Sequence, residues 1–312
     1  MDYRKLITNC GQPEYDRTFW NLMRGDKTAE QNLTEGRTSD TGAYALPNSS
    51  GNGYEKAVTR ESVIRKISTV LCHYSGSVGV WATLSDDVAE FVPEDGSINV
   101  KDVINDFTRI LIGRHKLTTL LRLPMDFVSD AAFDLEGYLT KRLAKAFART
   151  EDKGFISGTG IDEPFGLLHD EEGAEIGVAT DTLSYDAVID QYFSVKPEYR
   201  QNGVWLMNDE TAHALKKLKD EAGNYLWRGS DDTIMGKPVM ISEYMPNAEP
   251  GAKPILFGDF RYYWIVKRSP VTVRTLKELF ALKGQLGYLA FEFIDGRLIR
   301  REAVKALQIT SA

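Results

Sequence analysis

The stretch Gly154-Phe155-Ile156-Ser157-Gly158-Thr159-Gly160, followed by Pro164-Phe165-Gly166-Leu167-Leu168, carries the most information in this chain. A second stretch of the same kind is Ile234-Met235-Gly236-Lys237-Pro238-Val239. Both are punctuated by glycine and lie among apolar residues. Because glycine tolerates positive φ and the close approach of another backbone, these stretches predict tight backbone geometry rather than chemistry.

Three kinds of functional site that use glycine-rich loops fail a spacing test here. A P-loop requires Lys directly after its last glycine, but Gly160 is followed by isoleucine. A dinucleotide fingerprint requires a third glycine at a fixed offset, and Gly158-Thr159-Gly160 has none. A nucleophile elbow requires glycine two residues before and after the serine, and neither flank of Ser157 provides it. The loop therefore predicts neither nucleotide binding nor a hydrolase site.

The composition is that of a globular protein and excludes several classes. The chain has 312 residues, 42% hydrophobic and 27% charged, with a net charge of -7. Tight binding to duplex DNA depends on neutralisation of phosphates by Lys and Arg, so an acidic chain is a poor candidate, although it can enclose DNA. We expect Cys10 and Cys72 to be reduced thiols, because they form no disulfide framework or zinc pattern. With no segment of roughly 20 apolar residues and no apolar signal-peptide core, we expect a soluble protein made in a cytoplasm.

Titratable residues form no convincing catalytic or metal-binding pattern. The best local case for a metal is His169, which is followed by Asp170, Glu171 and Glu172, but a solvated acidic turn is the interpretation that we favour. Adjacent carboxylates such as Asp86-Asp87 point apart on a strand, whereas paired-carboxylate catalysis requires them to converge. We therefore expect no catalytic residue, no metal site and no cofactor.

Residues 1 to about 60 differ in composition from the rest of the chain. They are rich in Asn, Thr, Gly, Asp and Arg, and their apolar residues are sparse. Such a segment can hardly bury enough surface to fold alone, so we predict an extended arm ordered mainly by other subunits. The pair Phe19-Trp20 and the stretch Ala43-Tyr44-Ala45-Leu46-Pro47 predict that part of it docks. Residues 63–83 have the composition of strands.

The segment from residue 84 to residue 106 is strongly acidic. It contains one base, Lys101, and a turn signal at residues 91–98 between two β-like flanks. This pattern predicts a long hairpin whose tip is too polar for a core. Its acids are Asp86, Asp87, Glu90, Glu94, Asp95, Asp102 and Asp106.

The clearest helix is predicted from about Ser129 to about Arg149, where apolar residues recur with a period of 3.6. Ser129 is the expected N-cap. Basic residues follow an i, i+4 row away from the apolar face that contains Leu139, and they predict a basic surface on a long exposed helix. These residues are Lys141, Lys145, Arg149 and, beyond them, Lys153.

Shorter elements are predicted after the glycine-rich loop. Helices are expected at 184–195 and, capped by Asn208, at 209–219. Strands are expected at 203–207, 238–243, 254–258, 261–267, 271–274, 286–294 and 297–309. The last two would be joined by a turn at Asp295-Gly296, because Asp-Gly between β-like runs is a strong hairpin signal.

In this order, the segments resemble the major capsid proteins of tailed bacteriophages, which have the Hong Kong 97-like shell fold. Residues 126–168 are similar to the family's most recognisable stretch, a long helix followed by Thr150-Glu151-Asp152-Lys153 and a Gly-Thr-Gly loop that ends in Pro-x-Gly-Leu. Residues 203–264 are similar to a second family block. Its motifs here are Trp205-Leu206-Met207-Asn208, Lys219-Asp220, Gly223-Asn224-Tyr225-Leu226, Gly236-Lys237-Pro238-Val239, Met245-Pro246 and Phe257-Gly258-Asp259-Phe260.

The resemblance implies an α+β fold with an N-arm, an extended β-hairpin loop, a peripheral domain built on a long spine helix, and an axial domain. The expected parts are an N-terminal arm at 1–62, a peripheral strand at 63–76, the extended loop at 77–113, the peripheral domain with its spine helix at 114–181, the axial domain at 182–275, and closing strands of the peripheral domain at 276–312.

The function that the resemblance implies is structural, not enzymatic. The chain would self-assemble as hexamers and pentamers into the icosahedral head shell that encloses the double-stranded DNA genome of a tailed phage. It would be located in the virion capsid and be assembled in the cytoplasm of the bacterial host. Its partners would be itself, the portal, and scaffold, protease or decoration proteins; it would enclose DNA without sequence-specific binding and contact no membrane. Two alternatives stay open: an encapsulin-like nanocompartment shell of the same fold that encloses protein cargo, and a soluble enzyme with an unrecognised site.

Charge predicts one inter-subunit contact. The acidic hairpin, through Asp86, Asp87, Glu90, Glu94 and Asp95, would lie across the basic helix of an adjacent subunit, at Lys141, Lys145, Arg149 and Lys153. The alternative is two independently solvated faces. Some family members join a Lys of the loop to an Asn of the peripheral domain covalently. Residues 276–288 contain no Asn, so we expect non-covalent locking.

Overall fold

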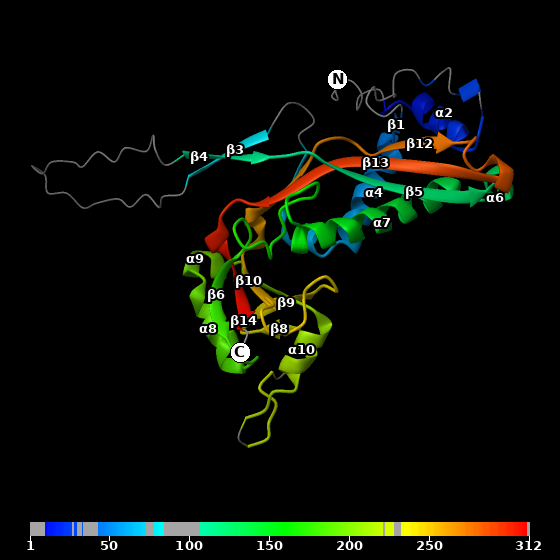
Figure 1. Cartoon of the computed structure of the whole chain (residues 1–312). Coiled ribbons are helices and arrows are strands. Elements are labelled where there is room, and N and C mark those ends of the chain that lie inside the picture. The colour runs from blue at the N-terminus through cyan, green and yellow to red at the C-terminus, as the bar shows by residue number, and fades with distance from the viewer. Residues whose placement is uncertain are drawn as a thin grey trace, which may run out of the picture.

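The computed structural model describes residues 10–26, 28–29, 33, 43–72, 78–83, 107–130, 132–220, 222–227 and 232–310, with the backbone alone at 78–83 and 107–109. Figure 1 shows three parts: an elongated layer of strands and helices, a more compact unit below one end of it, and a two-stranded projection beyond that end. We call them the plate, the lobe and the ribbon.

The plate is built on the long strand β13 (Gln285–Leu298). One edge of β13 pairs with β12 (Thr272–Leu276) and then with β11 (Tyr263–Lys267), and the other edge pairs with β5 (His115–Pro124), all antiparallel. The short strands β1 (Tyr44–Ala45) and β2 (Thr69–Cys72) pair with β12 and β11 and complete a six-stranded sheet.

Helices cover one face of the plate sheet. The helices of the plate are α2 (Pro13–Met23), α4 (Asn48–Glu61), α5 (Ile64–Ile67), α6 (Met125–Ser129) and α7 (Leu135–Ser157). Alternate residues of β13, such as Leu286, Tyr288 and Ala290, share a core with Tyr54 of α4 and Phe147 of α7. This alternation follows from the two-residue period of a strand.

The N-terminal segment differs from the extended arm that we predicted for residues 1–62. In its described part, α2 and α4 are helices that pack on their own chain, with Phe19 and Tyr54 fully buried. The Tyr288 hydroxyl also donates to the carbonyl oxygen of Met23 at 2.8 Å. The few apolar residues are spaced three or four apart, so each helix presents one apolar stripe, and tertiary packing outweighs weak helix propensity.

The structure also differs from the prediction at residues 64–67 and at both ends of the long helix. Residues 64–67 form α5 rather than a strand. The long helix starts at Leu135 rather than near Ser129, because the Asp134 side chain accepts the Gly137 N–H and caps it, while residues 125–129 form the separate helix α6. The long helix also runs on to Ser157, into the glycine-rich stretch.

The glycine-rich stretch has the tight geometry that the sequence predicts. A Cβ on Gly158 would lie 2.2 Å from the Pro164 carbonyl oxygen. Gly160 has a φ of +78°, and the Gly166 N–H donates to the Gly158 carbonyl oxygen at 2.9 Å. These glycines therefore serve the close return of the chain behind α7.

The lobe contains the second six-stranded sheet, in the order β6-β14-β10-β7-β9-β8. Its strands are β6 (Glu175–Thr180), β7 (Val204–Met207), β8 (Thr233–Ile234), β9 (Lys237–Ile241), β10 (Ile255–Gly258) and β14 (Val304–Ile309), and its helices are α8 (Tyr185–Ser194), α9 (Pro197–Arg200) and α10 (Asp209–Lys216). The predicted Asn208 cap is confirmed, since its side chain accepts the Thr211 N–H. Ser184 likewise caps α8 by accepting the Ala187 N–H.

The prediction of a hairpin turn at Asp295-Gly296 is wrong. Both residues lie inside β13, where Asp295 pairs with Val266. Glycine is required at 296 because a Cβ there would lie 2.5 Å from the Tyr263 hydroxyl and 2.8 Å from the Phe155 ring. The Asp-Gly signal thus reflects crowding across the sheet rather than a turn.

The division that we predicted between residues 275 and 276 also differs from the structure. Strands β11 and β12 belong to the plate, and β14 belongs to the lobe. The chain therefore passes from the lobe to the plate after β10, because β11 and β12 pair in the plate sheet. It returns to the lobe after β13, because β14 pairs in the lobe sheet. Together with the passage from α7 to β6, three crossings tie the two parts together.

The ribbon consists of β3 (Val78–Thr83) and β4 (Phe107–Ile112), which pair antiparallel from Val78↔Ile112 to Thr83↔Phe107. This pairing agrees with the predicted hairpin. The acidic segment 84–106 lies outside the described residues. In Figure 1 the ribbon extends away from the plate, at the end opposite α6.

Candidate functional site

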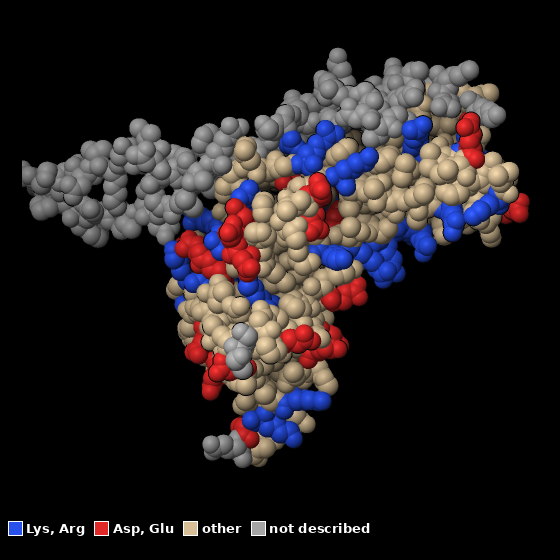
Figure 2. Space-filling model, viewed as in Figure 1, with Lys and Arg blue, Asp and Glu red and all other residues tan. Residues whose placement is uncertain are grey.

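The basic residues predicted on the long helix are exposed. Lys141, Lys145, Arg149 and Lys153 all lie on the solvent side of α7, away from the buried Leu143. Figure 2 shows Lys and Arg side chains gathered along the side of the plate that carries this helix. Their spacing of four residues makes a slowly winding stripe, which we call the α7 stripe.

The predicted acidic partners of this stripe lie outside the described residues. Asp86, Asp87, Glu90, Glu94 and Asp95 belong to the segment between β3 and β4. The contact between acidic hairpin and α7 stripe therefore stays a prediction.

A second basic surface lies on the opposite face of the plate sheet, and sequence reasoning missed it. Lys116 and Arg122 of β5 and Arg274 of β12 are exposed, and the register places Leu120, Leu289 and Arg274 side by side across three strands. At the positions of 116–122, 272–276 and 287–293 that share this face, no residue is acidic. Exposed and covered residues alternate along β5, but its sequence does not alternate polar and apolar residues, since Thr118-Thr119 and Leu120-Leu121 are adjacent, so the half-buried strand pattern was hidden.

Charged side chains are also buried between the helices and the sheet of the plate. Arg65 of α5 makes a bidentate pair with Glu151 of α7, at 2.6 and 2.9 Å. Lys267 of β11 lies 3.0 Å from Glu292 of β13. Glu55 of α4 contacts both cations. The side chains of Arg65, Lys267, Glu151 and Glu292 are at most 3% exposed. We call these five residues the ionic cluster.

The ionic cluster contains more acids than bases. Two cations face three carboxylates, so one negative charge is in excess. Burial raises the pKa of Glu151 to about 7, against the attraction of Arg65 and with the repulsion of Glu292. Although burial opposes it, the pKa of Glu55 is lowered by Lys267 and Arg65. Because burial raises the pKa of Glu151, the protonated form of this carboxyl is favoured, which offsets the excess negative charge of the cluster.

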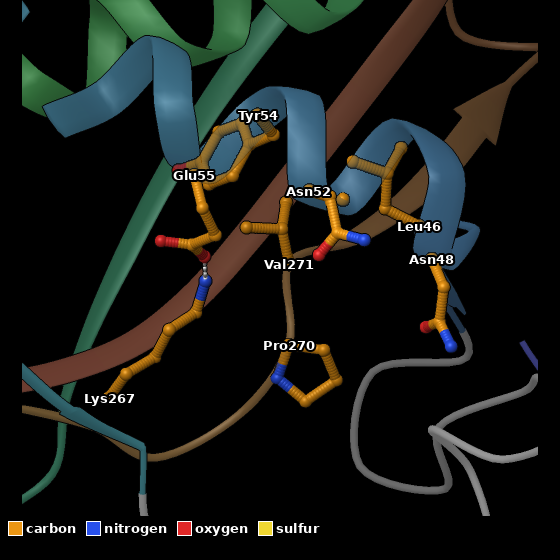
Figure 3. A pocket seen from close by; sticks show the side chains of 9 residues that line it. Leu46, Asn48, Asn52, Tyr54, Glu55, Lys267, Pro270 and Val271 are labelled. Carbon is orange, nitrogen blue, oxygen red and sulfur yellow. Dashed lines mark hydrogen bonds and ion pairs between the residues drawn. The ribbon is translucent and has the colours of Figure 1, made fainter. Parts of the chain in front are cut away.

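A pocket of about 270 Å³ opens beside the ionic cluster. Figure 3 shows Leu46, Pro270 and Val271 as its apolar wall, with Glu55 and Lys267 paired at one end. The Lys267 ammonium is also paired with Glu292 and lies 5.2 Å from the Tyr54 ring. Because these ion pairs engage the amine, it is not poised as a nucleophile, and the arrangement supports a structural role.

The acidic turn at His169 is likewise a structural element. The Nδ1 atom of His169 accepts the N–H groups of Glu171 and Glu172 at 3.2 and 3.1 Å. Asp170 pairs with Lys253 at 2.6 Å. Among the residues that the structure describes, no group of three or more His, Cys, Asp and Glu side chains is arranged to hold a metal ion.

The comparison with known proteins identifies the family. The Phage capsid family matches residues 42–309, so the chain belongs to this family. It is 25% identical, over 241 residues, to the major capsid protein of Halomonas phage phiHAP-1. This match covers 76% of this chain and 38% of that protein. It is 26% identical, over 157 residues, to the capsid polyprotein of Pseudomonas phage PAJU2, covering 47% and 23%. The chain thus spans less than two fifths of either curated relative.

Solved shells have the same fold. The capsid of a native GTA particle matches with a TM-score of 0.66 and 30% identity, covering 82% of this chain and 90% of that one. The procapsid of satellite phage P4, at 10% identity and a TM-score of 0.55, supports the fold alone. The chain therefore has the α+β Hong Kong 97-like fold of its capsid family. Within the described ranges, no helix has the length and apolar character that crossing a membrane requires.

Proposed function

We propose that this chain assembles as hexamers and pentamers into the closed icosahedral head of a tailed phage, where it encloses double-stranded DNA without reading its sequence and performs no catalysis. Assembly takes place in the cytoplasm of the host, with the portal and with scaffold, protease or decoration proteins as further partners. In family terms, the plate is the peripheral domain with α7 as its spine, the lobe is the axial domain, and the ribbon is the base of the extended loop.

The observation that carries this proposal is the ribbon. It leaves the body of the subunit, and the segment that it carries has seven acids and one base between residues 84 and 106. A projecting acidic element is complementary to a basic surface on another copy, and the α7 stripe provides one. We propose that Asp86, Asp87, Glu90, Glu94 and Asp95 lie across Lys141, Lys145, Arg149 and Lys153 of the adjacent subunit.

Each such ion pair contributes little by itself. Exposed pairs contribute roughly 0 to 1 kcal/mol and weaken with salt. A closed shell repeats every contact in each subunit, so small energies add up to a decisive preference for assembly. The stability of the unassembled subunit should not change when these charges are lost.

The test is charge reversal on α7. The double variant Lys141→Glu/Lys145→Glu should give soluble subunits that form no shells in negative-stain images. The matched control is Lys56→Glu/Arg60→Glu, an exposed i, i+4 pair on the neighbouring helix α4, which should assemble. Normal shells from the α7 variant at low and moderate salt would refute the contact. Failure of the unmodified chain to form particles in any buffer would refute the function.

The contents of the particles separate the phage head from a nanocompartment of the same fold. Nuclease-resistant nucleic acid in particles purified from infected cells supports the head. A single co-purifying enzyme in its place would support the nanocompartment.

A further inference from the structure

The ribbon joins the plate beside Asp295. Strand β13 pairs with β5 as far as Ile294↔His115. From Asp295 onward it continues along β11 toward the lobe, while β4 ends at Ile112 and the chain enters β5 at His115. The link between ribbon and plate is therefore residues 113–114, beside Asp295.

The buried carboxylate of Asp295 holds this link. The residue is 5% exposed. Its Oδ2 atom accepts the N–H of Gly113, and its Oδ1 atom accepts the N–H of Gly296 at 2.7 Å. His115 Nε2 lies 3.5 Å from Oδ1. A charged acceptor in a buried site makes strong, directional hydrogen bonds, so the carboxylate restrains the backbone where the ribbon departs.

The neighbourhood of the link is closely packed. A Cβ on Gly113 would lie 3.1 Å from Oδ2 of Asp295. Arg297 donates from Nη1 to the Leu111 carbonyl oxygen at 3.3 Å. The Arg114 guanidinium lies 3.7 Å from the centre of the Phe293 ring. Ile112, 3% exposed, packs in a small cluster with Val266 and Ile299. These contacts attach the ribbon base to the body, while the carboxylate restrains the link itself.

We propose that Asp295 is a positioning residue for assembly, whose carboxylate sets the direction in which the ribbon leaves the plate and thereby the curvature of the shell. This inference rests on the proposed function. Six residues of strand extend roughly 20 Å, so a rotation of about 10° at the link displaces the far end of the ribbon by roughly 3 Å. That displacement is as large as a whole hydrogen-bond length, and neighbouring subunits would meet at a different angle.

The experiment compares Asp295→Ala with Asp152→Ala. Asp152 is the matched control, because it is also buried and accepts two backbone N–H groups, from Val63 and Ile64, but the backbone that it restrains is that of α5 rather than the link at 113–114. We expect Asp295→Ala particles to show a shifted or broadened diameter distribution by electron microscopy, with Asp295→Asn nearer to the unmodified chain. Asp152→Ala should lower the melting temperature but keep the normal diameter.

A readout on the unassembled subunit tests the same point. Amide exchange in the segment 110–115 should be at least tenfold faster in Asp295→Ala. If that variant fails to fold, Gly113→Ala pushes on the same carboxylate from the other side and should shift the diameter too. Asp295→Ala or Gly113→Ala particles of unmodified diameter would overturn the inference while the unmodified chain still assembles. If the unmodified chain makes no particles, the proposed function itself fails.

Discussion

The plate and the lobe each contain a six-stranded sheet, but their interiors differ. The lobe core is aromatic: Trp205 and Phe257 stack with ring centroids 4.1 Å apart, and Tyr192 lies 5.2 Å from Phe257. The plate contains the ionic cluster between its helices and its sheet. Apolar burial is therefore the main source of stability in the lobe. The plate also contains buried ion pairs, in which the loss of one partner leaves the other charge buried without compensation.

The two interiors also differ in how far apart their partners lie in the sequence. In the plate, Arg65 and Glu151 are separated by 86 positions, and Tyr54 and Glu292 by 238. In the lobe, Asn208 contacts the carbonyl of Met245 across 37 positions, and the returning strand β14 adds longer contacts, such as Gln191 to the Lys305 carbonyl oxygen across 114. The plate consequently depends on its N-terminal helices to complete its core, while much of the lobe is assembled from one stretch of chain.

The largest expected effect is the loss of a cation from the ionic cluster. Arg65→Met would leave three carboxylates with Lys267 alone, and breaking a buried pair from one side costs about 3 to 5 kcal/mol. Urea denaturation of the subunit measures this loss. Arg142→Met, an exposed position on α7, is the control and should change stability by less than about 0.5 kcal/mol. A loss below about 1 kcal/mol at Arg65 would mean that the cluster is not a structural element.

The next prediction concerns the dependence of folding stability on pH, and it again distinguishes the plate from the lobe. With the pKa of Glu151 raised from its ordinary 4.5 to about 7, the folded chain keeps a proton that the unfolded chain has released. Stability should therefore fall as the pH rises from about 4.5 to about 7, by about 3 kcal/mol from this group. The lowered pKa of Glu55 acts at lower pH, where its contribution is lost on acidification.

Glu151→Gln should remove most of this slope between pH 5 and pH 7, as measured by chemical denaturation at several pH values. Glu198→Gln, an exposed carboxylate of the lobe, should keep the slope of the unmodified chain. The cluster is wrongly described if both variants lose the slope or if neither does.

The smallest effect is expected at a helix cap of the lobe. Asn208 accepts the Thr211 N–H at 2.7 Å and donates to the Met245 carbonyl oxygen at 3.2 Å. Asn208→Ala should cost about 1 to 2 kcal/mol, without dependence on pH between 5 and 8. Ser184→Ala, which removes the plainer cap of α8, should cost less. A pH-dependent loss at Asn208 would contradict the apolar description of the lobe.

The sequence by itself determined the features that depend on neighbours along the chain. Caps, amphipathic periods and turn signals act within a few residues. They predicted the strand at 204–207, the helix that begins at 185, the helix capped by Asn208, the exposed α7 stripe and the pairing of the ribbon. The resemblance that rests on the glycine-rich motifs extended this to the family and its fold.

Only the tertiary structure decided the features that join distant segments. Four such features have no local signal: the continuous strand through Asp295-Gly296, the ionic cluster, the basic face of β5 and the three crossings between plate and lobe. Each depends on which distant residues come together when sheets pair and helices pack. Strand pairing keeps Asp295-Gly296 inside a strand despite its turn signal, and helix packing buries Arg65 beside Glu151 of another helix.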